Sequence, residues 1–212
     1  MLREIQETKE VRRIPAQRDP IEVRKDLQTL RKRAIALGAS DAAVISGSDV
    51  VFSKVLQKRV AADKRLPSVH WPLDYPKDDL EAAIKAYQNG VFFRVKGDAR
   101  MPDYGGGQVS DPNHRERMQR VYEIATVLES ESFYMGYHLA VGFATGNCRA
   151  IFCAEESSCW AAVKGRKCVQ PYKGRPSMEA AGIDPVAMAK AVKWGLPKRE
   201  GAPLLAGLVM VV

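Results

Sequence analysis

The pattern of hydrophobic and polar positions predicts helices and strands in a mixed order. Asp19-Pro20 has the form of a helix start, with an aspartate cap and a proline in the first turn. Apolar residues then recur at roughly helical spacing as far as Gly38, which is a natural helix end. Two short apolar runs, 42–46 and 50–55, indicate strands joined by a tight turn.

The middle of the chain predicts a helix, a strand and a long helix. After the proline-rich stretch 64–77, a helix is expected over 78–87 and a strand over 91–95. A helical pattern over 113–146 then leads into the first cysteine. The apolar positions that keep to one face of this helix are Val121, Ile124, Ala125, Leu128, Met135 and Leu139.

The last part of the chain predicts one more helix and one more strand. Asp184-Pro185 caps a helix that runs to about residue 194, and the apolar run 204–212 reads as a buried strand. Because strands and helices mix without a βαβ repeat, the predicted fold class is α+β, or a three-layer α/β arrangement. Residues 1–18 are polar and predict a flexible arm, and residues 19–212 predict a single globular domain.

Composition excludes several classes of protein. Hydrophobic residues make up 46% of the chain, which is enough for a core. The N-terminal residues do not read as a secretory signal, and the longest apolar run is half a membrane span, so we expect a cytoplasmic protein. The net charge of +8 lies mainly in the first half of the chain, but no nucleic-acid-binding motif accompanies it.

The four cysteines of the chain are Cys148, Cys153, Cys159 and Cys168, all within one short window. Thiols stay reduced in the cytoplasm, which argues against two disulfides, and unrelated core cysteines would be scattered. Four thiols so close together fit one tetrathiolate metal site. We therefore expect 147–174 to be a metal-binding segment in which all four cysteines are ligands.

The spacing C-x4-C-x5-C-x8-C does not identify the metal. It is neither the C-x2-C-x2-C of bacterial ferredoxins nor the paired C-x2-C of a zinc ribbon. Six basic and two acidic residues over 148–175 suit a centre of net negative charge, which both an iron–sulfur cluster and a zinc tetrathiolate carry. The basic residues are Arg149, Lys164, Arg166, Lys167, Lys173 and Arg175.

The histidines add little to this site. His138 is expected on the helix before the cysteines, His114 is expected to be exposed, and His70 stands alone in its surroundings. No motif of a zinc protease, serine hydrolase or phosphate-binding loop is present, so the sequence names no catalytic residue.

The stretch after the last cysteine carries a resemblance to a known family. Cys168-Val-Gln-Pro171 is followed by the decapeptide 175–184, Arg-Pro-Ser-Met-Glu-Ala-Ala-Gly-Ile-Asp. This pattern resembles the signature of a family of predicted metal-binding proteins, domain of unknown function 2284, over roughly residues 40–212. Gly174 stands where the family has alanine. The first three cysteines are spaced more widely than in the family, and the N-terminal cysteines of many members are missing, so no second metal site is expected.

The resemblance implies metal binding rather than a particular reaction. The leading hypothesis is an iron–sulfur protein, with a 4Fe-4S cluster, that serves as an electron-transfer module or redox subunit and meets a protein partner. The alternative is structural zinc in an assembly or interaction protein. The decapeptide itself reads as a scaffold, because Ser177 can cap a helical turn that Gly182 closes, and direct catalysis by Glu179 or Asp184 is disfavoured.

Overall fold

A four-stranded antiparallel sheet forms the middle layer of the molecule. The computed structural model describes residues 18–56, 58, 80–97, 111–161, 167–196 and 204–211. In sheet order the strands are β1 (Asp41–Ile45), β2 (Asn89–Arg94), β4 (Ala206–Val211) and β3 (Val141–Ala144). All three neighbouring pairs are antiparallel, which confirms the predicted α+β class.

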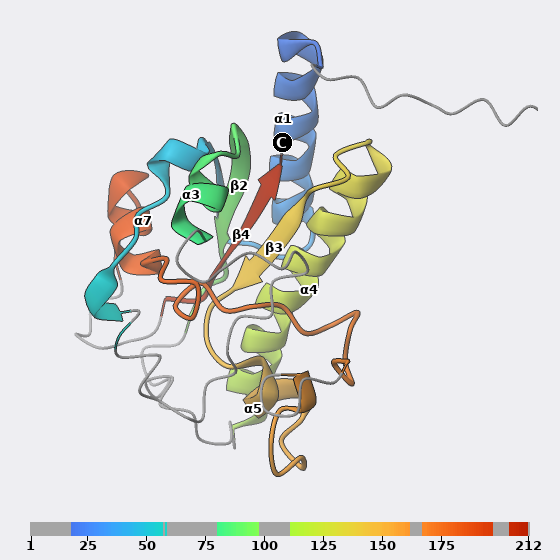
Figure 1. Cartoon of the computed structure of the whole chain (residues 1–212), viewed down its shortest axis with the longest axis vertical. Helices are drawn as coiled ribbons and strands as arrows, with labels where there is room; N and C mark the ends of the chain where they lie inside the picture. The colour runs from blue at the N-terminus through green and yellow to red at the C-terminus, as the bar shows by residue number, and fades with distance from the viewer. Residues whose placement is uncertain are drawn as a thin grey trace, which may run out of the picture.

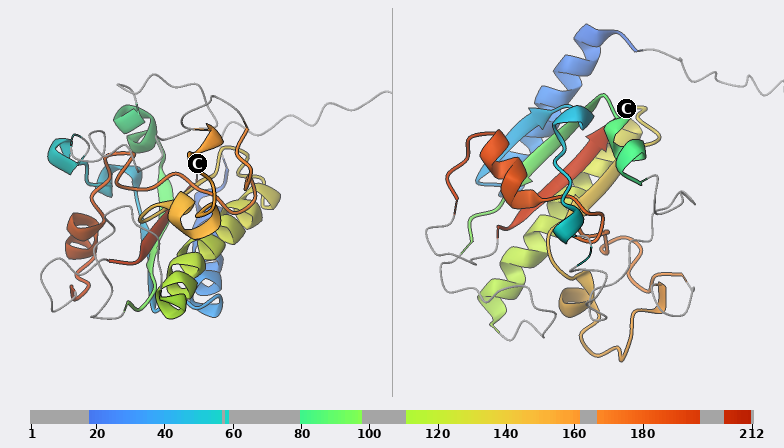
Figure 2. Two further views of the ribbon diagram at one scale, coloured as in Figure 1. Left: turned by 90° about the horizontal axis from the view of Figure 1, so that it is seen from below. Right: turned by 60° about the vertical axis from the view of Figure 1, so that its left-hand side comes forward.

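Helices cover both faces of this sheet (Figures 1 and 2). The helices α1 (Pro20–Ala36) and α4 (Pro112–Tyr134) pack on one face, and α3 (Leu80–Lys85) and α7 (Pro185–Ala191) lie on the other. Side chains alternate between the two cores, as expected for a strand buried on both sides. Val91 and Phe93 enter the core under α1 and α4, and Phe92 enters the opposite one.

The centre of the sheet is packed too closely for a side chain at Gly207. A Cβ atom there would lie 2.3 Å from the ring of Phe93. The aromatic ring therefore lies directly across the backbone of β4, whose residues are all buried. This contact holds β2 and β4 together in the middle of the molecule.

The predicted helix ends are confirmed at both ends of the chain. Asp19 accepts a hydrogen bond from the Ile21 amide at 2.8 Å, and Gly38 adopts a left-handed φ of 105° after α1. Asp184 caps α7 through the amides of Val186 and Ala187. These caps satisfy amides that have no partner inside the helix.

The predicted long helix over 113–146 is wrong beyond residue 134. Helix α4 ends at Tyr134, and Gly136 turns the chain away with a φ of 93°. Residues 141–144 then form β3, because the Gly142 amide is bound by the carboxylate of Glu129 and the segment pairs with β4. The chain thus enters the cysteine segment from a strand.

The predicted strand over 50–55 is also wrong. Gly47–Asp49 form a 3-10 helix, η1, only Phe52 makes a β-bridge, and residues 54–56 are helical. The bridge partner of Phe52 is Ile183, at the end of the decapeptide. This apolar run is therefore used to hold the decapeptide and not to extend the sheet.

Several predictions concern residues that lie outside the described part of the chain. These are most of the N-terminal arm 1–18, the proline-rich stretch 64–77 and His70. Among the described residues, no helix has the length and apolar character needed to cross a membrane.

Candidate metal centre

Thr145, the residue that follows β3, is tied firmly to the sheet by two hydrogen bonds. The Thr145 amide donates to the Ala206 carbonyl at 2.9 Å, and the Thr145 hydroxyl accepts from the Ala206 amide at 3.1 Å. Gly146 then takes a left-handed φ of 84°, and the Asn147 side chain caps the short helix α5 (Cys148–Phe152). Helix α5, which begins at Cys148, thus follows the end of β3 and lies beside the first half of α4 (Figure 1).

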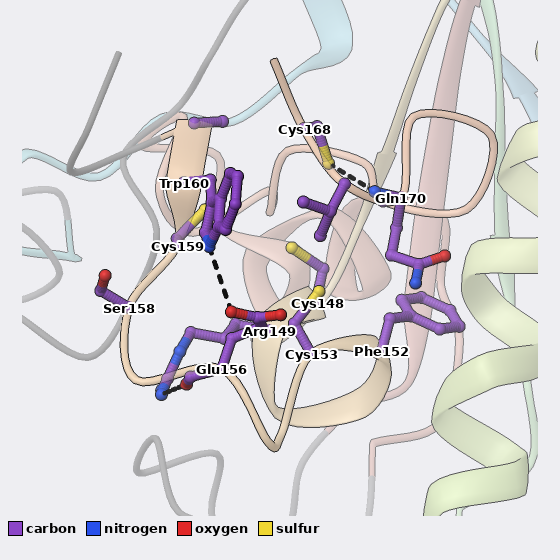
Figure 3. A pocket seen from close by; sticks show the side chains of 13 residues that line it. Cys148, Arg149, Phe152, Cys153, Glu156, Ser158, Cys159, Trp160, Cys168 and Gln170 are labelled. Atoms are coloured by element: carbon purple, nitrogen blue, oxygen red, sulfur yellow. Dashed lines mark hydrogen bonds between the residues drawn. The ribbon is translucent and has the colours of Figure 1, made fainter. Parts of the chain in front are cut away.

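All four cysteines line one cavity, and none of them is in a disulfide. Cys148 begins α5, Cys153 follows its last residue, and Cys159 and Cys168 come from the loops beyond it. Figure 3 shows their sulfur atoms on different sides of the same space. The cavity is completed by Arg149, Phe152, Glu156, Ser158, Trp160, Ala161, Val169, Gln170 and Gly174.

The thiols differ in their surroundings. Cys148 as a residue keeps some solvent contact, but its thiol is enclosed, whereas Cys168 is exposed. Burial, followed by the nearby Cys159, Cys168 and Cys153 thiols, raises the pKa of Cys148 to about 12. Burial also raises the pKa of Cys153. Because apolar burial disfavours the thiolate, a cation in the cavity is what would allow these groups to ionise.

The loops that carry the cysteines are braced by polar contacts around the cavity (Figure 3). The Gln170 amide donates to the Cys168 sulfur at 3.3 Å. The Trp160 indole donates to the Glu156 carboxylate at 3.1 Å, and the Arg149 guanidinium donates to the Glu156 carbonyl. Glu156 is therefore bound through its backbone by Arg149 and through its side chain by Trp160.

Arg175 connects the loop after Cys168 to helix α4. Its guanidinium lies 3.1 Å from the Glu129 carboxylate and donates to the carbonyls of Pro171 and Gly174. Glu129 also accepts from the Gly142 amide at 2.5 Å. Burial raises the pKa of Glu129, while Arg175 opposes the shift. Sequence reasoning missed Glu129; its only signal was a carboxylate next to Leu128 on the buried face of the helix.

The decapeptide forms the predicted capped turn. The Ser177 hydroxyl accepts from the Ala180 amide at 2.9 Å, and Gly182 is left-handed with a φ of 80°. Met178 is fully buried under the sheet. The Glu179 carboxylate accepts from the Gly146 amide, with the closer oxygen at 3.2 Å. These contacts fit the scaffold role expected for the decapeptide.

Two predictions about the histidines are wrong. His114 is 7% exposed in the first turn of α4, with its ring 3.7 Å from the carboxylate of the capping residue Asp111. His138 is not helical; it follows the end of α4 and packs edge-on against Phe133 at 5.0 Å. Neither histidine lines the cysteine cavity.

Four thiols are a suitable set of ligands for a four-thiolate centre, although their sulfur atoms are not yet close enough together to bind one. Among the described residues, no three Cys, His, Asp or Glu side chains are grouped closely enough to hold a metal ion. The four sulfurs share one cavity, and soft thiolates suit iron–sulfur clusters and zinc. The ligand set is therefore inferred from this shared cavity.

Comparison with known proteins agrees with a metal site. No curated protein and no solved structure matches the chain significantly. A family model described as "Predicted metal-binding protein (DUF2284)" matches residues 69–211, which include all four cysteines and the decapeptide. The match covers more than half of the chain, so the chain belongs to this family of predicted metal-binding proteins.

Proposed function

We propose that Cys148, Cys153, Cys159 and Cys168 hold one iron–sulfur cluster of the 4Fe-4S type, and that the protein is an electron-transfer module or a redox subunit of a larger enzyme. The observation that carries this proposal is that four free thiols from one segment line a single cavity. Four thiolates are the usual ligand set of such a cluster, which supplies one-electron storage when bound.

The residues around the thiols support this use. Phe152, Trp160 and Val169 give the cavity an apolar lining beside the sulfurs. The Gln170 amide donates to Cys168, and hydrogen bonds to ligand sulfurs raise the reduction potential of a centre. The partly exposed position of the cysteines leaves a short path to a partner.

Structural zinc in an assembly or interaction protein is the second candidate. The same four thiols would complete a tetrahedral zinc site, and closed four-ligand sites of this kind are structural. No acid–base pair among the described residues faces the cavity in a way that defines a reaction, so we assign no catalytic residue.

Metal analysis of protein purified without oxygen separates the two candidates. We expect a brown protein with about four irons and four acid-labile sulfides per chain. A colourless protein with one zinc per chain would establish the alternative. Each of the four Cys→Ser variants should lower metal occupancy, most of all Cys148→Ser, because this thiol is the most enclosed. Any variant with full occupancy and an unchanged spectrum removes that cysteine from the ligand set.

We further propose that basic residues near the cysteines receive an acidic redox partner. Lys167 and Lys173 are exposed next to Cys168, whereas Arg149 is engaged with Glu156, and Lys164 and Arg166 lie outside the described residues. Reversing both lysines to Glu should weaken partner binding and its dependence on salt. If binding is unchanged while the midpoint potential falls, the charges act on the centre and do not recruit a partner.

A further inference from the structure

Glu179 places a carboxyl group against the backbone that leads into the first cysteine. The residue keeps some solvent contact, but its carboxyl group is surrounded by protein atoms. Both carboxylate oxygens lie near the Gly146 amide, at 3.2 and 3.3 Å. Gly146 is two residues before Cys148, and its carbonyl accepts from the Tyr122 hydroxyl at 3.2 Å. The peptide before the first cysteine is thus held from both sides.

The two glutamates that brace this region differ in charge compensation. Glu129 is paired with the guanidinium of Arg175 at 3.1 Å. Glu179 has no ion pair among the described residues, and its hydrogen-bond donors are neutral: its own amide, the Gly146 amide and Ser177. The other charged group that acts on it is the Asp184 carboxylate, which has the same sign. A buried carboxylate without a cation readily binds a proton.

The proton affinity of Glu179 agrees with this arrangement. Burial raises the pKa of Glu179 from 4.5 to about 7, and the hydrogen bonds from its own amide and from Gly146 limit the rise. Near neutral pH the group is therefore divided between its two protonation states. Glu179 is connected to the first cysteine through Gly146, two residues before Cys148, and negative charge added there would favour its protonated state.

We propose that Glu179 is a positioning residue that couples proton binding to metal binding: it holds the loop before Cys148 and takes one proton from water as the cysteine cavity gains net negative charge. Four thiolates around a divalent ion sum to a charge of about −2, so loading adds like charge at the end of the loop that this carboxylate binds through Gly146. The inference rests on the proposed metal binding by the four cysteines, but it holds for zinc and for an iron–sulfur cluster alike.

The proton balance of metal binding tests the coupling. Calorimetric titration of the reduced full chain with Zn²⁺, in buffers of different ionisation enthalpy at about pH 8, counts the protons released per metal. The thiols release protons, and uptake by Glu179 reduces the net number. We expect Glu179→Gln to release up to one proton more than the wild type. Glu155→Gln, the same change at an exposed glutamate in the cysteine segment, should match the wild type.

The positioning role is tested by affinity. Glu179→Gln keeps an acceptor for the Gly146 amide and should retain zinc affinity within about threefold, whereas Glu179→Ala should lose about tenfold or more. An alanine variant that binds zinc as tightly as the wild type overturns the positioning role. Equal proton counts for the wild type and Glu179→Gln overturn the coupling.

A measurement on the unmodified chain guards against variants that fold poorly. Infrared difference spectra of the wild type should show a protonated carboxyl band that appears on zinc loading and shifts when glutamate is isotopically labelled. A loaded protein without this band contradicts the coupling. A wild-type chain that binds neither zinc nor iron overturns the proposed function as well, so the two failures are distinguishable.

Discussion

The sheet and the cysteine segment are held together by different forces. Every residue of β4 is buried, and this strand pairs with β2 and β3 along its length. In the described part of the cysteine segment 147–174, the five-residue helix α5 and two helical residues, 160–161, are joined by turns and loops, and Cys168 is exposed. Apolar burial is thus concentrated in the sheet layers and reaches the segment at α5, where Ile151 joins the core and Phe152 packs against Tyr122. Beyond α5, on our proposal, the segment depends on a few polar contacts and on metal.

The contacts between the two regions explain how one can change without the other. The segment is attached through Thr145 to β4, through Arg175 to Glu129 and through Glu179 to Gly146. These three polar anchors lie at its ends, and α5 near its start also packs on α4. Metal binding should therefore order the interior of the segment and leave the sheet nearly unaffected.

Metal removal should have the largest effect, and a local one. Binding of zinc by zinc-finger peptides contributes about 10–16 kcal/mol to their folding. After chelation, limited proteolysis should cut first between Cys148 and Lys173, while the sheet and α4 stay protected. Mass spectrometry of the fragments identifies the cut sites. Equal protection of this segment with and without metal would contradict the idea that metal orders the segment.

A substitution in the sheet core should destabilise the whole fold, in contrast to the local effect of metal removal. Phe93 is fully buried between the sheet and the helices α1 and α4, so Phe93→Ala should cost about 3–5 kcal/mol in unfolding free energy. Phe133→Ala, at a phenylalanine that is 50% exposed, serves as the control and should cost under about 1 kcal/mol. Denaturant unfolding measures both. A similar loss in the two variants would show that the sheet core is not the main source of stability.

The sequence was informative where structure is fixed locally. The caps at Asp19, Asp184 and Ser177 were predicted because each side chain binds an amide two or three residues ahead. The strand predicted over 91–95 is visible in the apolar run 91–93, and β2 begins two residues earlier, at Asn89. The helix predicted over 113–146 is too long, because the pairing of 141–144 with β4 depends on residues more than 60 positions away.

The sequence indicated which cysteines gather at the candidate site, but it did not indicate which residues support them. The clustering of four cysteines is visible in the sequence, and the structure brings them to one cavity. The anchors Glu129–Arg175 and Glu179–Gly146 join residues that are 46 and 33 positions apart. Neither pair has a local pattern, because a single glutamate on a helix or turn usually faces solvent.

The change of unfolding free energy with pH should show the contribution of Glu179. Its pKa of about 7 in the folded chain is above the ordinary 4.5, so the folded state binds more protons between these values. The metal-free chain should therefore lose stability as pH rises from about 4.5 to about 7, by an amount on the order of 3 kcal/mol from this group. Urea unfolding at several pH values should show a flatter profile for Glu179→Gln than for the wild type or Glu155→Gln. A Glu179→Gln profile that parallels the wild type would assign the slope to other groups.

The smallest effect is expected at the edge of the cavity, where Gly174 stands in place of the family's alanine. A Cβ atom here would lie 3.5 Å from the Cys168 sulfur and 3.3 Å from the Gln170 carbonyl oxygen, so a methyl group fits with a slight shift. Gly174→Ala should change unfolding free energy by less than about 1 kcal/mol.

The same substitution should slow the alkylation of Cys168 by iodoacetamide severalfold in the metal-free chain, because the methyl group covers part of the exposed thiol. Gly195→Ala, where no atom lies within 4 Å, is the matched control and should leave the rate unchanged. An unchanged rate in Gly174→Ala would mean that Cys168 moves freely in the metal-free segment. The segment would then lack the order of the sheet even at Gly174, next to the anchor Arg175.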